Sequence, residues 1–199
     1  MYLICSDLEG VFVPEVWINV AEKTGIPELR ITTREIPDFD LLMNQRIKIL
    51  YEHGLKLKDI QSVVNDMVPI PGANSFIEWI KGKTQLIVVS DNFSQVVDPL
   101  MMQIGRPTLF CHDLVVDSAN RIINYKMRQP DLKNKTVEAL QGLKYNVIAI
   151  GDSYNDVSML KAAEIGILFR PPQNVIDDFP ELRVTFDYDE LKEILAHYI

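Results

Sequence analysis

Residues 1–14 read MYLICSDLEGVFVP, in which a short apolar run is followed by two acids with one residue between them. The run at residues 2–5 is typical of a buried strand, because it is apolar and polar residues follow it at once. Asp7 and Glu9 therefore fall just beyond the strand, where open α/β sheets bind their ligands. Two further apolar runs, at residues 86–89 and 147–150, also end in polar clusters, which read SDN and GDSYND.

The spacing of apolar residues after these runs predicts helices. Between residues 93 and 104 the apolar side chains fall on one helical face, and residues 156–163 continue in the same way. Repeated strand, turn and helix predict an α/β fold with a doubly wound, Rossmann-like parallel sheet. We also expect a β-hairpin from residues 114–117 and 121–125 at the edge of the sheet, and a closing helix within residues 186–199.

Residues 14–71 interrupt this rhythm with helical patterns and no convincing strand. Pro14 is suited to open a first helix and Gly25 to end it. A second helical pattern lies between residues 38 and 50. We therefore predict a helical cap at residues 14–71, inserted into an α/β core formed by residues 1–13 and 72–199.

Composition excludes several classes of protein. The chain has 199 residues and a net charge of −8, so its surface repels nucleic acid and anionic membranes. No apolar run approaches the ~20 residues that span a bilayer, and we find no signal peptide. Cys5 and Cys111 each lie in an apolar run, so we expect reduced, buried cysteines in a cytoplasmic protein.

The clusters after the strands have complementary chemistry. Asp7, Asp152 and Asp156 are carboxylates from distant parts of the chain that together suit Mg²⁺, which prefers oxygen ligands. With Lys133, such a metal would neutralise a phosphoryl group and allow a carboxylate to attack it. Glu9 is placed to protonate the leaving oxygen and then to deprotonate the acceptor. The sequence therefore predicts phosphotransfer through a covalent intermediate on Asp7.

In the order and spacing of its motifs the chain resembles the haloacid dehalogenase superfamily of phosphatases. The motifs that carry the resemblance are Asp7-Leu8-Glu9-Gly10-Val11, Ser90, Lys133 and Gly151-Asp152-x-x-Asn155-Asp156. Within that superfamily the chain is similar to phosphoserine phosphatases, and most similar to bifunctional ones that also transfer phosphate from phosphoserine to homoserine. The resemblance implies the haloacid dehalogenase fold, Mg²⁺ as cofactor, and phosphoserine with homoserine as substrates.

The resemblance also implies a role for each matching residue in the reaction. Asp7 would be nucleophile and metal ligand, and Glu9 would be the acid/base with its backbone carbonyl on the metal. Lys133 would hold phosphate, Asp152 would ligate Mg²⁺ and Asp156 would support the metal site. Further substrate contacts are implied for Ser90 at the phosphate, for Asn155 nearby, and in the cap for Glu15, Arg46 and Phe39.

Arg46 is also singled out by its own position. It lies about two helical turns after Phe39, on a face that is otherwise apolar. A fixed charge there is costly unless it is paired, and a substrate carboxylate is a fitting partner. The alternative is an ion pair with a cap acid, Glu35 or Asp40. Glu15 has a plain alternative too, as an acid in the first turn of its helix.

Two positions depart from the usual pattern of the family. Many relatives have Asp where this chain has Glu9, and many have glycines where Asp91 and Asn92 follow Ser90. Two other functions stay open, a phosphatase for another small ester and a phospho-acceptor receiver domain. The sequence does not decide whether water or homoserine is the acceptor. It also leaves the oligomeric state open, with a homodimer as one alternative.

Overall fold

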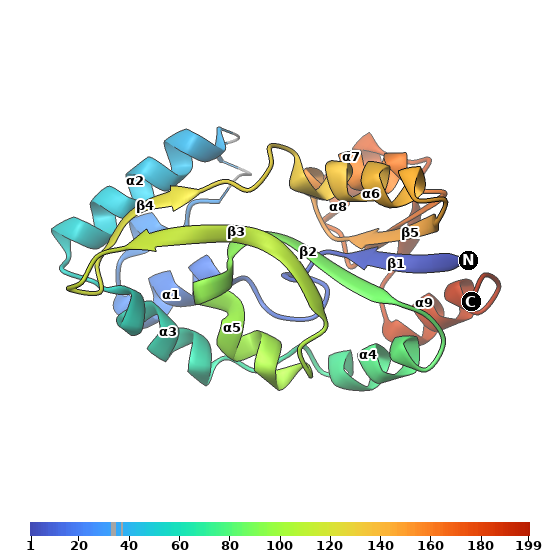
Figure 1. Ribbon diagram of the computed structural model, residues 1–199, viewed down its shortest axis with the longest axis horizontal. Helices are drawn as coiled ribbons and strands as arrows, with labels where there is room; N and C mark the ends of the chain where they lie inside the picture. Colours follow the sequence, from blue (N-terminus) through green and yellow to red (C-terminus); the bar gives the residue numbers. More distant parts are fainter. Residues whose placement is uncertain (33–34, 37) are drawn as a thin grey trace.

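A computed structural model describes residues 1–32, 35, 36 and 38–199. A seven-stranded sheet in the order β4-β3-β2-β1-β5-β6-β7 runs through the molecule (Figure 1). All neighbouring pairs are parallel except β3 with β4. The strands are β1 Tyr2–Ser6, β2 Leu86–Phe93, β3 Thr108–Val116, β4 Ile122–Lys126, β5 Asn146–Gly151, β6 Ile165–Phe169 and β7 Arg183–Thr185. The predicted α/β fold is confirmed.

Helices cover both faces of the sheet. They are α1 Val16–Thr24, α2 Phe39–Glu52, α3 Leu57–Asp66, α4 Ala73–Lys81, α5 Ser94–Gln103, α6 Leu132–Gly142, α7 Val157–Ala162, α8 Gln173–Asp178 and α9 Tyr188–Leu195, with short 3-10 helices η1 Pro27–Arg30 and η2 Tyr154–Asp156. Alternate residues of β1 point to opposite faces. Ile4 therefore packs in the larger core cluster, whereas Leu3 and Cys5 pack in a second cluster on the other side.

The segment between β1 and α4 is helical, as the sequence predicts. It holds α1, η1, α2 and α3, which lie with the hairpin β3-β4 at one end of the molecule (Figure 1). Gly25 ends α1 with φ of 70°, a left-handed conformation that glycine adopts without strain. The ring of Phe39 on α2 lies 5.8 Å from that of Tyr125 on β4. The cap limits at residues 14 and 71 remain a prediction.

Several boundaries differ from those predicted. β2 does not end at Val89 but continues to Phe93, so Ser90, Asp91 and Asn92 belong to an extended strand. The register with β3 shifts between Val89 and Phe93, which is how the strand accommodates its polar end. The hairpin at the sheet edge is confirmed, although its first strand is longer than predicted. β6 and β7 were not anticipated, because short apolar runs do not distinguish strands from helix segments.

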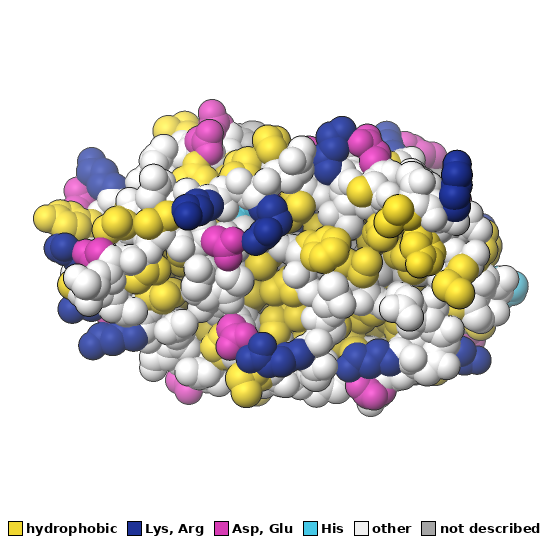
Figure 2. All heavy atoms as spheres, in the orientation of Figure 1, with side chains coloured by type: hydrophobic (Ala, Val, Ile, Leu, Met, Phe, Trp, Pro, Cys, Tyr) yellow, Lys and Arg dark blue, Asp and Glu magenta, His cyan; other side chains and the backbone are white. Residues whose placement is uncertain are grey.

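Surface and core agree with the composition. Cys5 and Cys111 are buried free cysteines. On the face drawn in Figure 2, basic and acidic side chains are interspersed with apolar ones. Among the described residues, no helix is long and apolar enough to span a bilayer.

Candidate active site

The turn after β1 brings the first two acids to the carboxyl end of the sheet. The N–H of Asp7 donates to the carbonyl of Ile150 on β5 at 2.9 Å, which ties the start of the turn to the neighbouring strand. Gly10 adopts φ of 74° and donates its N–H to the carbonyl of Val13 at 2.8 Å, so the chain reverses at once. The side chains of Asp7 and Glu9 consequently reach the same pocket.

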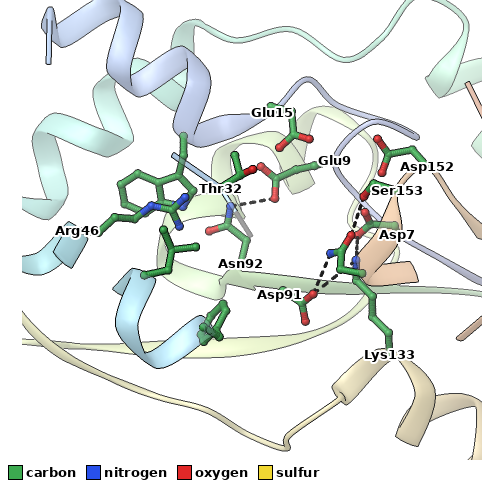
Figure 3. Close-up of a pocket in the computed structure, with 14 residues that line it drawn as sticks. Asp7, Glu9, Glu15, Thr32, Arg46, Asp91, Asn92, Lys133, Asp152 and Ser153 are labelled. Atoms are coloured by element: carbon green, nitrogen blue, oxygen red, sulfur yellow. Dashed lines mark hydrogen bonds and ion pairs between the residues drawn. The ribbon is translucent and has the colours of Figure 1, made fainter. Parts of the chain in front are cut away.

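Residues that lie far apart in the sequence line this pocket (Figure 3). Figure 3 places Arg46 and Lys133 at opposite ends, with Glu9 and Asn92 between them. The lining residues are Asp7, Glu9, Glu15, Trp17, Thr32, Phe39, Leu42, Arg46, Asp91, Asn92, Lys133, Asp152, Ser153 and Asn155. The pocket therefore offers a cation at each end and acids along its walls.

Lys133 is the centre of a buried charge cluster. Its Nζ lies 2.8 Å from Asp156 Oδ1 and 3.0 Å from Asp7 Oδ1. Asp91 Oδ2 is further away, at 3.6 Å. The three carboxylates hold the pKa of Lys133 well above its usual value, against the opposing effect of burial, so the lysine stays charged. It is 2% exposed, so it is not a surface lysine.

The loop after β5 is shaped around Asp156. This carboxylate accepts the N–H of Asp152 at 2.9 Å and of Ser153 at 3.1 Å through Oδ2, while Oδ1 holds Lys133. A Cβ at Gly151 would come within 2.4 Å of Asp156 Cβ, so the packing requires glycine there. Asp156 thus fixes both the loop and the lysine.

Asp7, Asp152 and Asp156 form a group that could hold a metal ion. One oxygen from each lies within 4.8 Å of the others, and all three side chains are buried. Burial, followed by the charge of Asp156, raises the pKa of Asp7 well above its usual range. The same two causes raise the pKa of Asp152 to about 7. Carboxylates that repel one another in this way are a fitting environment for a cation.

Glu9 is held from two sides. Its Oε1 accepts the N–H of Val16, the first residue of α1, at 2.7 Å. Its Oε2 accepts the side-chain N–H of Asn92 at 3.1 Å. Burial raises the pKa of Glu9, and these two donors oppose that rise. The carboxyl group is therefore fixed in place by one N–H donor on each oxygen.

Arg46 forms the other end of the pocket and is 5% exposed. Its guanidinium lies 4.5 Å from the centre of the Trp17 ring and donates from Nη2 to the carbonyl of Ile31 at 2.7 Å. Its buried Nε has no partner among the described residues. Burial lowers the pKa of Arg46 to about 10, so it remains charged at neutral pH. In the described part of the chain, no ion pair with Glu35 or Asp40 is formed.

The other predicted contact residues are placed as follows. Phe39 begins α2 and lines the pocket. Glu15 lines it from the N-cap of α1, whose first N–H is bonded by Glu9. Asn155 lines it and donates to Asp91 Oδ2 at 3.0 Å. Ser90 is 1% exposed and is not among the lining residues, and its Oγ accepts the N–H of Asn92 at 3.2 Å.

Sequence reasoning missed several residues of the pocket. Trp17 packs in the core, and its ring also lies under the Arg46 guanidinium. Asp91 and Asn92 were noted without a role, although their place after Ser90 was the available signal. Thr32 and Ser153 also line the pocket, and no sequence pattern marked them.

Comparison with known proteins identifies the family to which the chain belongs. The family profile described as haloacid dehalogenase-like hydrolase matches residues 17–164, most of the chain. The chain belongs to the haloacid dehalogenase-like hydrolases. Membership in this family excludes the receiver-domain alternative, because that is a different class of protein.

Two curated relatives match nearly the whole chain. A phosphoserine phosphatase of Pseudomonas syringae pv. tomato is 51% identical over 96% of this chain and 81% of its own length. Phosphoserine phosphatase ThrH of Pseudomonas aeruginosa is 51% identical over 96% of this chain and 94% of its own length. Among solved structures, an apo phosphoserine phosphatase aligns with a TM-score of 0.77 at 20% identity, covering 99% of this chain and 98% of the other. The structural likeness confirms the haloacid dehalogenase fold.

Proposed function

We propose that the protein hydrolyses phosphoserine through an aspartyl-phosphate on Asp7. The observation that carries the proposal is the separation of charge in one pocket, with Lys133 beside Asp7 at one end and Arg46 at the other. A substrate with a phosphate at one end and a carboxylate at the other fits this arrangement. The relatives named above are phosphoserine phosphatases, which supports the same substrate.

In the first half of the reaction a carboxylate oxygen of Asp7 attacks phosphorus. The bond from Asp7 to phosphorus forms as the ester O–P bond breaks, and Glu9 gives its proton to the departing serine oxygen. Lys133 offsets the charge of the phosphoryl oxygens. A solved phosphoserine phosphatase with the same fold is described as a phospho-aspartyl intermediate analogue, which is consistent with this route.

In the second half the carboxylate of Glu9 takes a proton from water. The water oxygen bonds to phosphorus, the bond to Asp7 breaks, and inorganic phosphate leaves. If homoserine replaces water, its hydroxyl oxygen receives the phosphoryl group and the product is phosphohomoserine. Homoserine, like serine, carries a carboxylate that Arg46 can pair with, which supports it as a second acceptor.

We propose Mg²⁺ as the metal of the acidic group. The metal ligands would be the carboxylates of Asp7 and Asp152 and the backbone carbonyl of Glu9. Asp156 would add negative charge beside them. The donors are all hard oxygens, the type that Mg²⁺ prefers. When bound, the metal supplies positive charge to the phosphoryl group.

One experiment tests the substrate and the acceptor together. The enzyme with Mg²⁺ and phosphoserine is incubated with and without homoserine, and free phosphate and phosphohomoserine are quantified. We expect many turnovers to phosphate without homoserine, and part of the flux as phosphohomoserine with it. Turnover of phosphoethanolamine, which lacks the carboxylate, at the same kcat/KM would instead favour the alternative of a phosphatase for another small ester.

A further inference from the structure

Asn92 makes a contact that the proposed reaction does not yet use. It stands near the end of β2, is 3% exposed, and lines the pocket beside Glu9 (Figure 3). Its Nδ2 donates to Glu9 Oε2 at 3.1 Å. A buried side-chain amide that faces the catalytic acid/base is in a position to control it.

The orientation of the amide is determined by the backbone. Asn92 Oδ1 accepts the N–H of Phe93 at 2.9 Å. If the amide were flipped, its NH₂ would face this N–H and its oxygen would face the Glu9 carboxylate, so both contacts would be repulsive. The side chain can therefore present only a donor to Glu9.

The second donor on Glu9 comes from a different part of the fold. Val16 N–H at the start of α1 bonds Oε1 at 2.7 Å, so each carboxylate oxygen has one N–H donor. Two donors from separate elements fix both the position and the plane of the carboxyl group. Each oxygen keeps a second lone pair free to exchange a proton with the substrate.

We propose that Asn92 is a positioning residue, which holds Glu9 at the leaving-group oxygen for proton transfer. The inference rests on the proposed function, in which Glu9 protonates that oxygen. It also gives a physical reason for the two departures from the family pattern noted in the sequence. The longer side chain of Glu9 reaches β2, and Asn92 supplies the donor that fixes it there.

The test exploits the dependence of general acid help on the leaving group. Serine departs from phosphoserine as a poor leaving group and requires a proton, whereas acetate departs from acetyl phosphate without one. Single-turnover formation of the aspartyl-phosphate is measured with both substrates in the Mg²⁺-loaded wild type, Asn92→Ala and Asn92→Asp. Asn92→Asp keeps the acceptor for Phe93 N–H and replaces the donor that Glu9 Oε2 accepts with a second acceptor.

We expect both variants to form the intermediate from phosphoserine about 10- to 100-fold more slowly, the usual effect of losing one bond to a charged group. From acetyl phosphate we expect less than about a threefold change, since no acid is needed. Glu9→Gln should show the full loss of rate with phosphoserine, because it removes the acid itself. Adding Asn92→Ala to Glu9→Gln should slow the reaction with phosphoserine no further. Ser94→Ala is the matched control, because it removes a bond to Asp113 at the same strand end, outside the pocket.

Thermal unfolding of the metal-free variants adds a readout apart from activity. In a double-mutant cycle, Asn92→Ala and Glu9→Gln should be non-additive. Equal losses on both substrates, or an Asn92→Asp variant as fast as wild type on phosphoserine, would overturn the role of Asn92. If Glu9→Gln itself showed no dependence on the leaving group, the acid role of Glu9 in the proposed function would fail instead.

Discussion

Replacing Arg46 is the sharpest test of the proposed substrate. The guanidinium is buried at the end of the pocket away from Lys133, stacked on Trp17, and its Nε has no partner in the part of the chain that the structure describes. A substrate carboxylate would give that end of the pocket a counter-charge. Arg46→Met removes the charge and the donors but keeps an unbranched apolar stem over Trp17, so the packing changes less than with alanine.

The size of the effect follows from the general strength of the bond that the variant would lose. A hydrogen bond to a charged group contributes ~1.5–3 kcal/mol, and 1.4 kcal/mol corresponds to a factor of ten. We therefore expect Arg46→Met to raise KM for phosphoserine by about one to two decades. On p-nitrophenyl phosphate, which has no carboxylate, kcat/KM should change by less than about threefold.

The assay is steady-state phosphate release on both substrates, with thermal unfolding of each variant alongside. Arg46 also donates to the carbonyl of Ile31 at 2.7 Å, so some loss of stability is expected and must be separated from substrate binding. Arg46→Lys is the matched variant, since it keeps the charge but loses the planar fork, and its KM should lie between those of wild type and Arg46→Met. Equal losses on the two substrates would refute the reasoning and assign Arg46 to the fold or the phosphate.

Three further predictions follow from the acidic group. Asp7→Asn should abolish turnover, and mass spectrometry of quenched enzyme should find no phosphoenzyme; substantial turnover would exclude Asp7 as nucleophile. The pKa of Asp152 rises from 3.8 to about 7 in the folded protein, so the metal-free protein should lose stability as pH rises from about 4 to 7. Saturating Mg²⁺ should abolish this loss of stability. Thermal unfolding in chelator and in Mg²⁺ measures both effects. The Cβ of Gly151→Ala must displace Asp156, so kcat should fall at least tenfold and the melting temperature should drop. A wild-type rate would show instead that the loop tolerates a Cβ.

The parts of the site that the sequence could predict lie at strand ends. β1 and β5 are adjacent and parallel, so Asp7 and Asp152, which follow them, must lie at the same edge of the sheet. Lys133 could be placed because its helix begins one residue earlier and packs on that sheet. For these residues, local pattern and topology together determine position.

The rest depended on contacts that no local pattern encodes. The stacking of Arg46 on Trp17 joins two helices of the segment between β1 and β2. Apolar periodicity marks Arg46 as a charge on an apolar face, but it does not show which side chain Arg46 meets. Asn92 meets Glu9 because β2 continues as an extended strand, whereas the polar SDN sequence predicted its end. Polar residues that remain in a strand are stable there because the site supplies their partners.

The charges of the pocket also explain how an acidic chain could bind an anionic ester. Asp7, Asp156 and Asp91 surround Lys133, so much of the charge of this lysine is already balanced and by itself it attracts phosphate only weakly. A metal on Asp7 and Asp152 would restore the balance, and without one a phosphate dianion would meet mostly like charge. Arg46 is different: Glu9 and Glu15 attract its charge, but among the described residues no carboxylate forms an ion pair with it. Chelation should therefore abolish the binding of phosphate, whereas it should weaken the binding of free serine at the Arg46 end far less. Calorimetry with each ligand can measure this difference.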